Sequence, residues 1–332
     1  MQNTGRRKKQ VKDERRKEGG FSRLHVAVGV VKNPEGKILI SLRSDDVHQG
    51  GLWEFPGGKV ESGESVEQAL IRELKEELGI TAQALEPLIK IKHQYSDLNV
   101  LLNVYSVGLF SGVASGLEGQ DIKWVCPEEL SGYSFPEANK AIISAARLPS
   151  EYAILNGDNV EGLLVDLQRI LTQGVKLIQA RVKLLSPDEV KQFFSVALSL
   201  CKQQSAKLLV NSAVREIDSF QIDGIHLTSK DLCDLKCRPQ GYAWVGASCH
   251  NQQELKQAEA IGVDFVVLAP VLETTSHPDA SPLGWRVFEN LTNDVNLPVF
   301  ALGGMQENDK YQAIIAGAQG IAGISLFLNK QG

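Results

Sequence analysis

Glutamates gather in one short segment of the chain, and their type and spacing suit metal-dependent chemistry. The segment from Gly57 to Ile80 reads GGKVESGESVEQALIRELKEELGI. Residues three or four apart share a helix face, so Glu73, Glu76 and Glu77 would converge on one side of a helix. Carboxylates placed so closely repel one another, and the hard cations Mg²⁺ or Mn²⁺ are the natural partners of their oxygens. A solvated acidic helix is the alternative, and the letters ELKEEL alone favour it.

The helix that must position these carboxylates has sequence signals at both ends. Ser65 and Gln68 predict a capping box, and Gly79 stands where a helix C-terminus favours glycine. The preceding Gly57 and Gly58 let the backbone come close to a metal ion or a phosphate. Apolar residues recur with helical period at Val66, Ala69, Leu70, Leu74 and Leu78.

The spacing of the whole segment resembles the signature of the Nudix hydrolase family. Gly58 is followed after five residues by Glu64, and after seven more by RELKEELGI, residues 72–80. The resemblance implies an α+β Nudix fold, a mixed sheet sandwiched by helices, and hydrolysis of a nucleoside diphosphate linked to a further group. It also implies that Glu73 is the general base and that Glu76 and Glu77 bind metal. Arg72 and Glu64 would support this acidic cluster.

The resemblance extends to the MutT-type members of that family, pyrophosphohydrolases that remove 8-oxo-dGTP. It covers residues from about 24 to 148 and includes LHVAVGVV, LWEFPGGKVESGE and FPEANKAI. It implies that the Gly57 carbonyl and Glu118 bind metal, and that the nucleotide lies near Arg43, His48 and Phe55. At Leu98 the chain departs from these enzymes, which carry an arginine there near the base.

Asn139, in the sequence FPEAN, matches the asparagine that reads the oxidised purine in the MutT-type enzymes. An amide offers the paired donor and acceptor that such a base needs. The alternative is a helix N-terminal cap. The expected reaction converts a nucleoside triphosphate to the monophosphate and pyrophosphate, with Mg²⁺ or Mn²⁺ neutralising the phosphates and activating water.

The pattern of predicted strands and helices changes near Pro149. Together with the basic N-terminal segment, this change predicts that the chain has three parts. They are a basic, disordered extension over residues 1–22, an α+β domain over 23–149, and an α/β domain over 150–332. In the last part, near-continuous apolar runs such as KLLVNS and DFVVLAPV alternate with helical patterns. Parallel strands covered on both faces have this pattern. About eight strands in roughly 180 residues predict a (β/α)8 TIM-type barrel, with an open doubly wound sheet as the alternative.

The second half resembles the thiamine phosphate synthase and TenI family, over about residues 151–330. The order of LIQARVK, LLVNS, DGIHLTSKDL, VGASCH, APVLETTSHP and FALGG carries the resemblance. It implies a thiazole phosphate or another thiamine-related ligand near the ends of the barrel strands. The candidate residues for this site are Arg181, Lys183, Asn211, His277, Gly303, Gly304 and Ser325.

Two positions depart from the synthase pattern. Ser212 stands where a magnesium-binding aspartate is usual, and His277 where a lysine is usual. Moving a pyrophosphate-activated pyrimidine needs metal and positive charge, so these changes argue against synthase activity. TenI-like proteins tolerate such changes as tautomerases or ligand binders, and His277 is then either an acid-base residue or a loop histidine without a role.

Composition limits the remaining possibilities. The net charge is -5, although residues 6–18 hold eight basic and three acidic side chains, so the remainder carries about -10. We expect no stable nucleic-acid binding, since the basic extension lacks aromatic and apolar anchors. No apolar run is long enough for a membrane span, and five scattered cysteines suit reduced thiols in a cytoplasmic protein.

Two functions from different classes remain open. In the first, the Nudix half cleans the nucleotide pool by hydrolysing 8-oxo-dGTP, and the barrel is a passive or ligand-binding module. In the second, both halves serve thiamine metabolism, and the Nudix half hydrolyses a thiamine-related or toxic pyrimidine pyrophosphate. The FPEAN segment favours the first, whereas the fusion itself favours the second.

Overall fold

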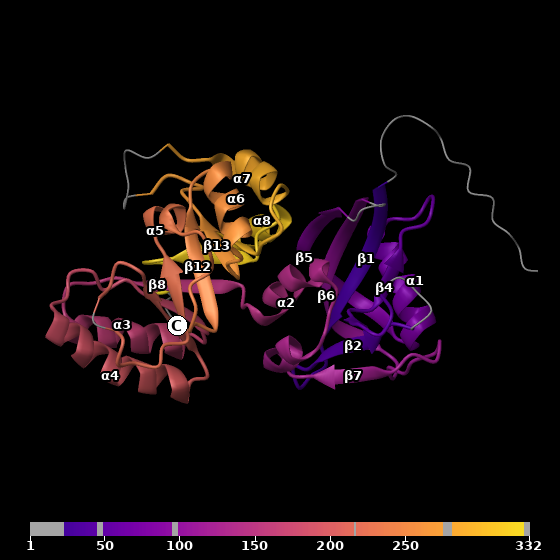
Figure 1. Ribbon diagram of the computed structural model, residues 1–332, viewed down its shortest axis with the longest axis horizontal. Coiled ribbons are helices and arrows are strands. Elements are labelled where there is room, and N and C mark those ends of the chain that lie inside the picture. The colour runs from indigo at the N-terminus through magenta and orange to yellow at the C-terminus, as the bar shows by residue number, and fades with distance from the viewer. Residues whose placement is uncertain (1–22, 45–48, 95–98, 216, 275–280, 329–332) are drawn as a thin grey trace, which may run out of the picture.

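The computed structural model describes residues 23–44, 49–94, 99–215, 217–274 and 281–328. Figure 1 shows an α+β part that carries α1 and α2, joined to a strand barrel surrounded by helices. Helix α2 lies between the two, and α1 lies on the far side of the α+β part. Among the described helices, none is long and apolar enough to cross a bilayer.

Two sheets form the α+β part. The larger sheet has the order β4-β1-β6-β5, and it is mixed because β1 and β6 run parallel while the other neighbours are antiparallel. The smaller sheet is antiparallel, with the order β3-β2-β7. The strands are β1 (Arg23–Val31), β2 (Ile38–Leu42), β3 (Trp53–Glu54), β4 (Gly57–Lys59), β5 (Thr81–Gln94), β6 (Asn99–Ser111) and β7 (Ile122–Val125).

Strand β1 explains why one helix covers each face of the larger sheet. Successive side chains of a strand point to opposite faces. Ala27 and Val31 belong to the buried cluster that includes Leu70 and Leu74 of α1 (Val66–Leu78). Val28 and Val30 belong to the cluster of Ile142, Ala145 and Ala146 in α2 (Lys140–Arg147). The predicted mixed sheet between helices is therefore confirmed.

Strand β5 is the longest of the described strands and was not recognised in the sequence. It lies at the edge of its sheet, where a proline such as Pro87 is tolerated. Register shifts interrupt its pairing with β6 at three places, so its side chains do not alternate regularly between buried and exposed. The helical run expected at EANKAIISAARL begins with a 3-10 turn, η2 (Glu137–Asn139), before α2 starts; another 3-10 helix, η1 (Pro127–Gly132), precedes it.

The second half is a closed barrel of eight parallel strands, as predicted, and not an open sheet. Closure is direct, because β15 pairs in parallel with β8. The strands are β8 (Glu151–Leu155), β9 (Leu177–Ala180), β10 (Lys207–Asn211), β11 (Gly224–Leu227), β12 (Trp244–Cys249), β13 (Phe265–Leu268), β14 (Val299–Ala301) and β15 (Gly320–Gly323). The covering helices are α3 (Val160–Thr172), α4 (Pro187–Gln203), α5 (Ser229–Asp234), α6 (Gln252–Ile261), α7 (Gly284–Thr292) and α8 (Asp309–Ile315).

The join between the halves is short. Helix α2 ends at Arg147 and β8 begins at Glu151. The five-residue strand β8, EYAIL, was not among the runs recognised in the sequence. The division into domains at residue 149 stays a prediction.

Candidate active site

Helix α1 has both of the ends that its sequence predicts. The Gln68 backbone N–H donates to Ser65 Oγ at 3.2 Å, and the Ser65 backbone N–H donates to Gln68 Oε1 at 2.8 Å. Gly79 ends the helix in the left-handed conformation, with φ +72°. The buried apolar stripe holds the helix on the sheet, so its carboxylates have a fixed platform.

Arg72 lies at the centre of the acidic cluster. Its guanidinium donates twice to Glu64, at 2.7 and 3.2 Å, and once each to Glu73 at 2.9 Å and Glu76 at 3.2 Å. It also donates to the Lys59 carbonyl at 3.1 Å. These hydrogen bonds hold the pKa of Glu64 below its usual value. One arginine therefore joins three glutamates to the strand that precedes the helix.

The two glycines before the helix leave room for this cluster. A Cβ on Gly58 would lie 2.2 Å from the Glu73 carboxyl carbon, so any side chain there would displace that carboxylate. A Cβ on Gly57 would lie 2.1 Å from the Ala27 carbonyl oxygen. The Gly57 backbone N–H donates to Glu77 Oε2 at 3.2 Å. Neither position therefore has room for a side chain without a shift, because Gly57 lies against backbone and Gly58 against the Glu73 carboxylate.

Glu77 is the most electrostatically perturbed acid of the cluster. Its pKa is raised to about 8, chiefly by burial and also by the nearby carboxylates of Glu73, Glu54 and Glu118, against the opposing Gly57 N–H. Glu54 itself has a raised pKa because of burial, and it pairs with Arg43. Glu54 was not anticipated from the sequence; its position one residue after Trp53 on β3 carries no spacing signal. A cation would relieve this concentration of acids.

Glu118 reaches the cluster because its loop docks on the end of α1. The last carbonyls of a helix lack partners within the helix. Here the Leu117 backbone N–H and Gln120 Nε2 both donate to the Glu77 carbonyl, at 2.9 and 3.0 Å. The Glu118 backbone N–H donates to Gln120 Oε1 at 2.9 Å. Gln120, which sequence reasoning missed, thus links the two acidic positions through their backbones.

The residues present suit a divalent cation chemically. Oxygen donors from several carboxylates, among them Glu77 with a pKa raised chiefly by burial and also by like charges, are the set that Mg²⁺ and Mn²⁺ bind. The side chains of the free protein are not pre-arranged around an ion: within the described ranges, no three His, Cys, Asp or Glu residues lie together as a ready metal site. Arg72 instead engages Glu64, Glu73 and Glu76.

Among the predicted substrate residues, Arg43 directly follows β2, Phe55 directly follows β3, and Asn139 stands directly before α2. Phe55 is buried and stacks on Phe135, with ring centroids 5.3 Å apart. Asn139 is only 7% exposed, yet its side chain makes no capping hydrogen bond with α2, so the capping alternative is not observed. His48 and Leu98 lie outside the described residues.

The barrel holds a buried chain of polar side chains. Asn211 donates to Gln179 at 2.8 Å, and Gln179 donates to the Tyr152 hydroxyl at 3.2 Å. That hydroxyl lies 3.0 Å from His226 Nδ1, and His226 Nε2 lies 3.0 Å from Ser248 Oγ. Of these five residues, only Asn211 was a sequence candidate. The five residues lie on the successive neighbouring strands β8 to β12, and the contact between Tyr152 and His226 joins β8 to β11, which do not pair with each other.

The other barrel candidates lie where strands end. Arg181 donates to Asn156 Oδ1 at 2.8 Å, and burial together with Arg181 lowers the pKa of Lys183. Gly303 and Gly304 follow β14, and Ser325 follows β15. His277 lies outside the described residues.

Ser212 has a defined role at the position of the missing aspartate. Its hydroxyl donates to Asp231, and Thr228 Oγ1 donates to the same carboxylate at 2.8 Å. The Ser212 hydrogen bond is the largest cause of a lowered Asp231 pKa. Asp231 therefore has two hydroxyl partners instead of a second carboxylate beside it.

A histidine-carboxylate pair at the end of β12 was also missed in the sequence. His250 Nδ1 lies 2.9 Å from Glu254 Oε2, and the His250 backbone N–H donates to the same oxygen at 2.7 Å. The signal was available, since the two residues are four apart directly after an apolar strand.

Comparison with known proteins matches the two halves separately. A family model for the NUDIX domain matches residues 27–145, and one for thiamine monophosphate synthase matches residues 151–327. The 8-oxo-dGTP diphosphatase of Escherichia coli is 38% identical over 124 residues, which cover 37% of this chain and 96% of that enzyme. The CTP pyrophosphohydrolase of the same organism is 39% identical over 122 residues, covering 37% of this chain and 90% of that enzyme.

The barrel also has a similar curated relative. The protein named "Putative thiamine-phosphate synthase 2" of Aquifex aeolicus is 36% identical over 183 residues, covering 54% of this chain and 98% of that protein. The chain thus combines an α+β fold that carries an acidic cluster with a closed barrel of eight parallel strands. Its first half belongs to the Nudix hydrolase family, and its second half to the thiamine monophosphate synthase family.

Proposed function

We propose that the Nudix half is a metal-dependent nucleoside triphosphate pyrophosphohydrolase, with 8-oxo-dGTP as its preferred substrate. The observation that carries the proposal is Glu77, a carboxyl close to Glu54, Glu73 and Glu118 whose pKa is raised to about 8, chiefly by burial and also by these three acids. Acids concentrated in this way are costly unless a cation and a phosphate chain occupy the site. The products would be 8-oxo-dGMP and pyrophosphate.

Each residue of the cluster would have a distinct task. When bound, Mg²⁺ or Mn²⁺ would neutralise the triphosphate and lower the pKa of the attacking water. Glu76, Glu77, Glu118 and the Gly57 carbonyl are the residues that would hold it. Glu73 would accept the proton from water at its carboxylate, in a position kept by Arg72 and by the open space at Gly58. Glu64 would hold the other side of Arg72.

Asn139 supports the choice of an oxidised purine. Its side chain is only 7% exposed and makes no capping hydrogen bond with α2. An amide that does not cap its helix could pair with a substrate that supplies both a donor and an acceptor, and such a substrate would bind preferentially. The 8-oxo group adds an N7–H donor to the purine edge, and the amide oxygen would accept from it. The similarity to an 8-oxo-dGTP diphosphatase supports the same substrate.

The test compares four substrates with the full-length protein: 8-oxo-dGTP, dGTP, CTP and hydroxymethylpyrimidine pyrophosphate. We expect kcat/KM to be highest for 8-oxo-dGTP. Replacing Asn139 with Ala should lower kcat/KM for 8-oxo-dGTP by about 10–100-fold and leave that for dGTP within about 3-fold, since hydrogen-bond readout of a base is lost. Fastest hydrolysis of the pyrimidine pyrophosphate would contradict the proposal and favour a thiamine-related function.

We further propose that the barrel binds a thiamine-related phosphate without acting as an efficient synthase. Ser212 supports this, because its hydroxyl engages Asp231 where a second carboxylate is usual in synthases. Arg181 and Lys183 would still attract a phosphate. Transfer of a pyrophosphate-activated pyrimidine would lack the charge that a fully ligated metal supplies.

Restoring the carboxylate tests the barrel proposal. Wild-type protein should form no thiamine phosphate from hydroxymethylpyrimidine pyrophosphate and thiazole phosphate, while it binds thiazole phosphate in calorimetry. Ser212→Asp should add a magnesium-dependent synthase activity, and Ser212→Asn should not, because it restores size without charge. Thiamine phosphate formation by the wild type at a rate similar to that of Ser212→Asp would refute the proposal.

A further inference from the structure

Helix α2 connects the candidate base-reading residue to the barrel. Asn139 stands directly before the helix, and Leu148 directly after it. Figure 1 shows α2 between the sheet of the Nudix half and the barrel. Eight helical residues span about 12 Å and behave as a rigid rod. Whatever fixes the C-terminal end of α2 therefore also fixes the place of Asn139.

The barrel supplies hydrogen bonds to that C-terminal end. Gln319, the residue before β15, is 7% exposed and belongs to the barrel. Its Nε2 donates to the Ala145 carbonyl at 3.2 Å and to the Leu148 carbonyl at 3.1 Å. Carbonyls at a helix end have no partner within the helix, and burying them unpaired is unfavourable. One barrel side chain thus completes the end of a helix that belongs to the Nudix fold.

Apolar and aromatic contacts hold the same end. Leu148 is 6% exposed and lies in the barrel cluster with Tyr152, Trp244 and Phe265. The Arg147 guanidinium lies over the Trp244 ring, 4.5 Å from its centroid. The next residues are also fixed, since the Ile321 backbone N–H donates to the Ser150 carbonyl at 3.0 Å. The C-terminal end of α2 is therefore packed into the barrel, and the two halves are not joined here by a flexible linker.

We propose that Gln319 is a positioning residue for the nucleotide site: by holding the end of α2, the barrel sets the place of Asn139 and so the nucleobase selectivity of the Nudix half. This inference rests on the proposed role of Asn139. It assigns the barrel a task in nucleotide hydrolysis that needs no barrel ligand. It also gives a physical reason for joining the two folds.

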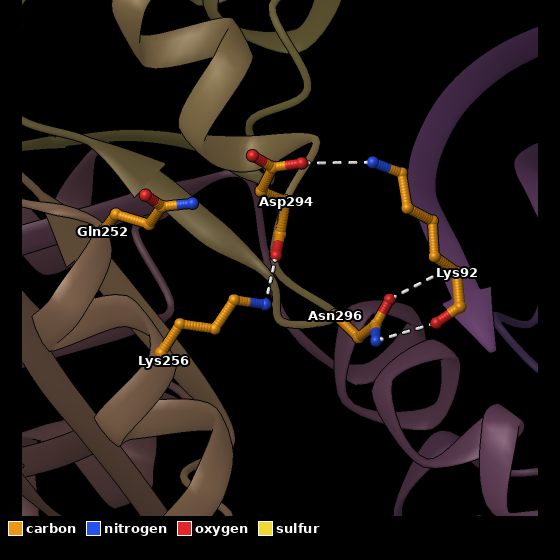
Figure 2. Close-up of a pocket in the computed structure, with 5 residues that line it drawn as sticks. All are labelled: Lys92, Gln252, Lys256, Asp294 and Asn296. Carbon is orange, nitrogen blue, oxygen red and sulfur yellow. Dashed lines mark hydrogen bonds and ion pairs between the residues drawn. The ribbon is translucent and has the colours of Figure 1, made fainter. Parts of the chain in front are cut away.

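A second contact between the halves provides a matched control. Figure 2 shows Lys92 of β5 facing Asp294 and Asn296 of the barrel. Asn296 accepts from the Lys92 backbone N–H at 2.8 Å and donates to the Lys92 carbonyl at 3.0 Å. Asn296 makes two hydrogen bonds across the same interface, as Gln319 does, but to β5 and not to α2.

The experiment compares Gln319→Met and Asn296→Ala in the full-length protein. Methionine keeps the volume of Gln319 and removes its donor. We expect the ratio of kcat/KM for 8-oxo-dGTP to that for dGTP to fall at least about 3-fold in Gln319→Met, a typical size for coupling through a packed network. The ratio should stay unchanged in Asn296→Ala. Hydrogen exchange of the α2 amides should speed up only in Gln319→Met.

The outcomes separate this inference from the proposed function. An unchanged ratio in a folded Gln319→Met protein, or an equal fall in Asn296→Ala, would overturn the positioning role while Asn139→Ala still lowers the ratio. If Asn139→Ala leaves the ratio unchanged, the base-reading role itself fails, and the positioning role fails with it. Should Gln319→Met not fold, Gln319→Glu, which keeps the size and loses the donor when ionised, serves in its place with the same criteria.

Discussion

Replacing Glu73 with Gln is expected to lower kcat for 8-oxo-dGTP by about 10²–10⁴-fold, the range that a general base contributes. Glutamine keeps the shape of the side chain and the contact with Arg72, but it cannot accept the proton from water. Folding should be little affected, since Arg72 keeps its bonds to Glu64 and Glu76. Steady-state kinetics with saturating Mg²⁺, together with thermal unfolding, measure both effects.

Glu77→Gln should lower kcat to a similar extent. It should also make the metal-free protein more stable near neutral pH. The folded pKa of Glu77 is raised to about 8, so the native state keeps a proton that the unfolded chain releases above about pH 4.5. This difference destabilises the free protein increasingly from pH 4.5 towards pH 8. Glutamine removes the penalty, and the metal-free variant should therefore unfold at a higher temperature than wild type at pH 7.5.

Glu67→Gln is the matched control on the same helix. Glu67 accepts a hydrogen bond from the Tyr105 hydroxyl at 2.6 Å and lies outside the proposed machinery. The kcat of the Glu67→Gln variant should stay within about 2-fold of wild type, as for a surface substitution. Near-normal turnover of Glu73→Gln or Glu77→Gln would refute the proposed site, whatever the effect on stability.

Acid should destabilise the barrel through His226. This histidine is 1% exposed, and burial lowers its pKa to about 3. Its ring nitrogens lie 3.0 Å from the Tyr152 hydroxyl and from Ser248 Oγ. In the unfolded chain it binds a proton below about pH 6.5, whereas in the native barrel it stays neutral until about pH 3. Between these values the free energy of unfolding should fall by about 1.4 kcal/mol per pH unit from this residue alone.

A variant without the titrating ring isolates this contribution from that of other groups. The free energy of unfolding of wild type and of His226→Gln would be measured in urea at pH 6, 5 and 4. We expect the wild-type value to fall more steeply, by about 1.4 kcal/mol for each pH unit. The variant should be less stable than wild type at pH 6 and lose part of that disadvantage at pH 4. Parallel pH dependences would show that His226 is not held neutral in the native barrel.

Features that depend on local geometry could be predicted from the sequence. The bounds and caps of α1, and the gathering of Glu73, Glu76 and Glu77, follow from helical spacing over a few residues. The regular alternation of apolar runs and helices likewise predicted a barrel. Asn139 and Glu118 became candidates through family resemblance, because no spacing rule connects them to the acidic segment of residues 57–80.

Which side chains from distant parts of the sequence come into contact became clear only from the tertiary structure. Glu54 joins the acids because β3 pairs with β2 beside the site, and Gln120 does so because its loop completes the end of α1. The polar chain from Asn211 to Ser248 includes a contact between β8 and β11, which do not pair with each other, and the barrel itself closes between strands about 170 residues apart. The Gln319 contact with α2 crosses a similar separation. Such pairings arise from packing of whole faces, so no short window of sequence contains them.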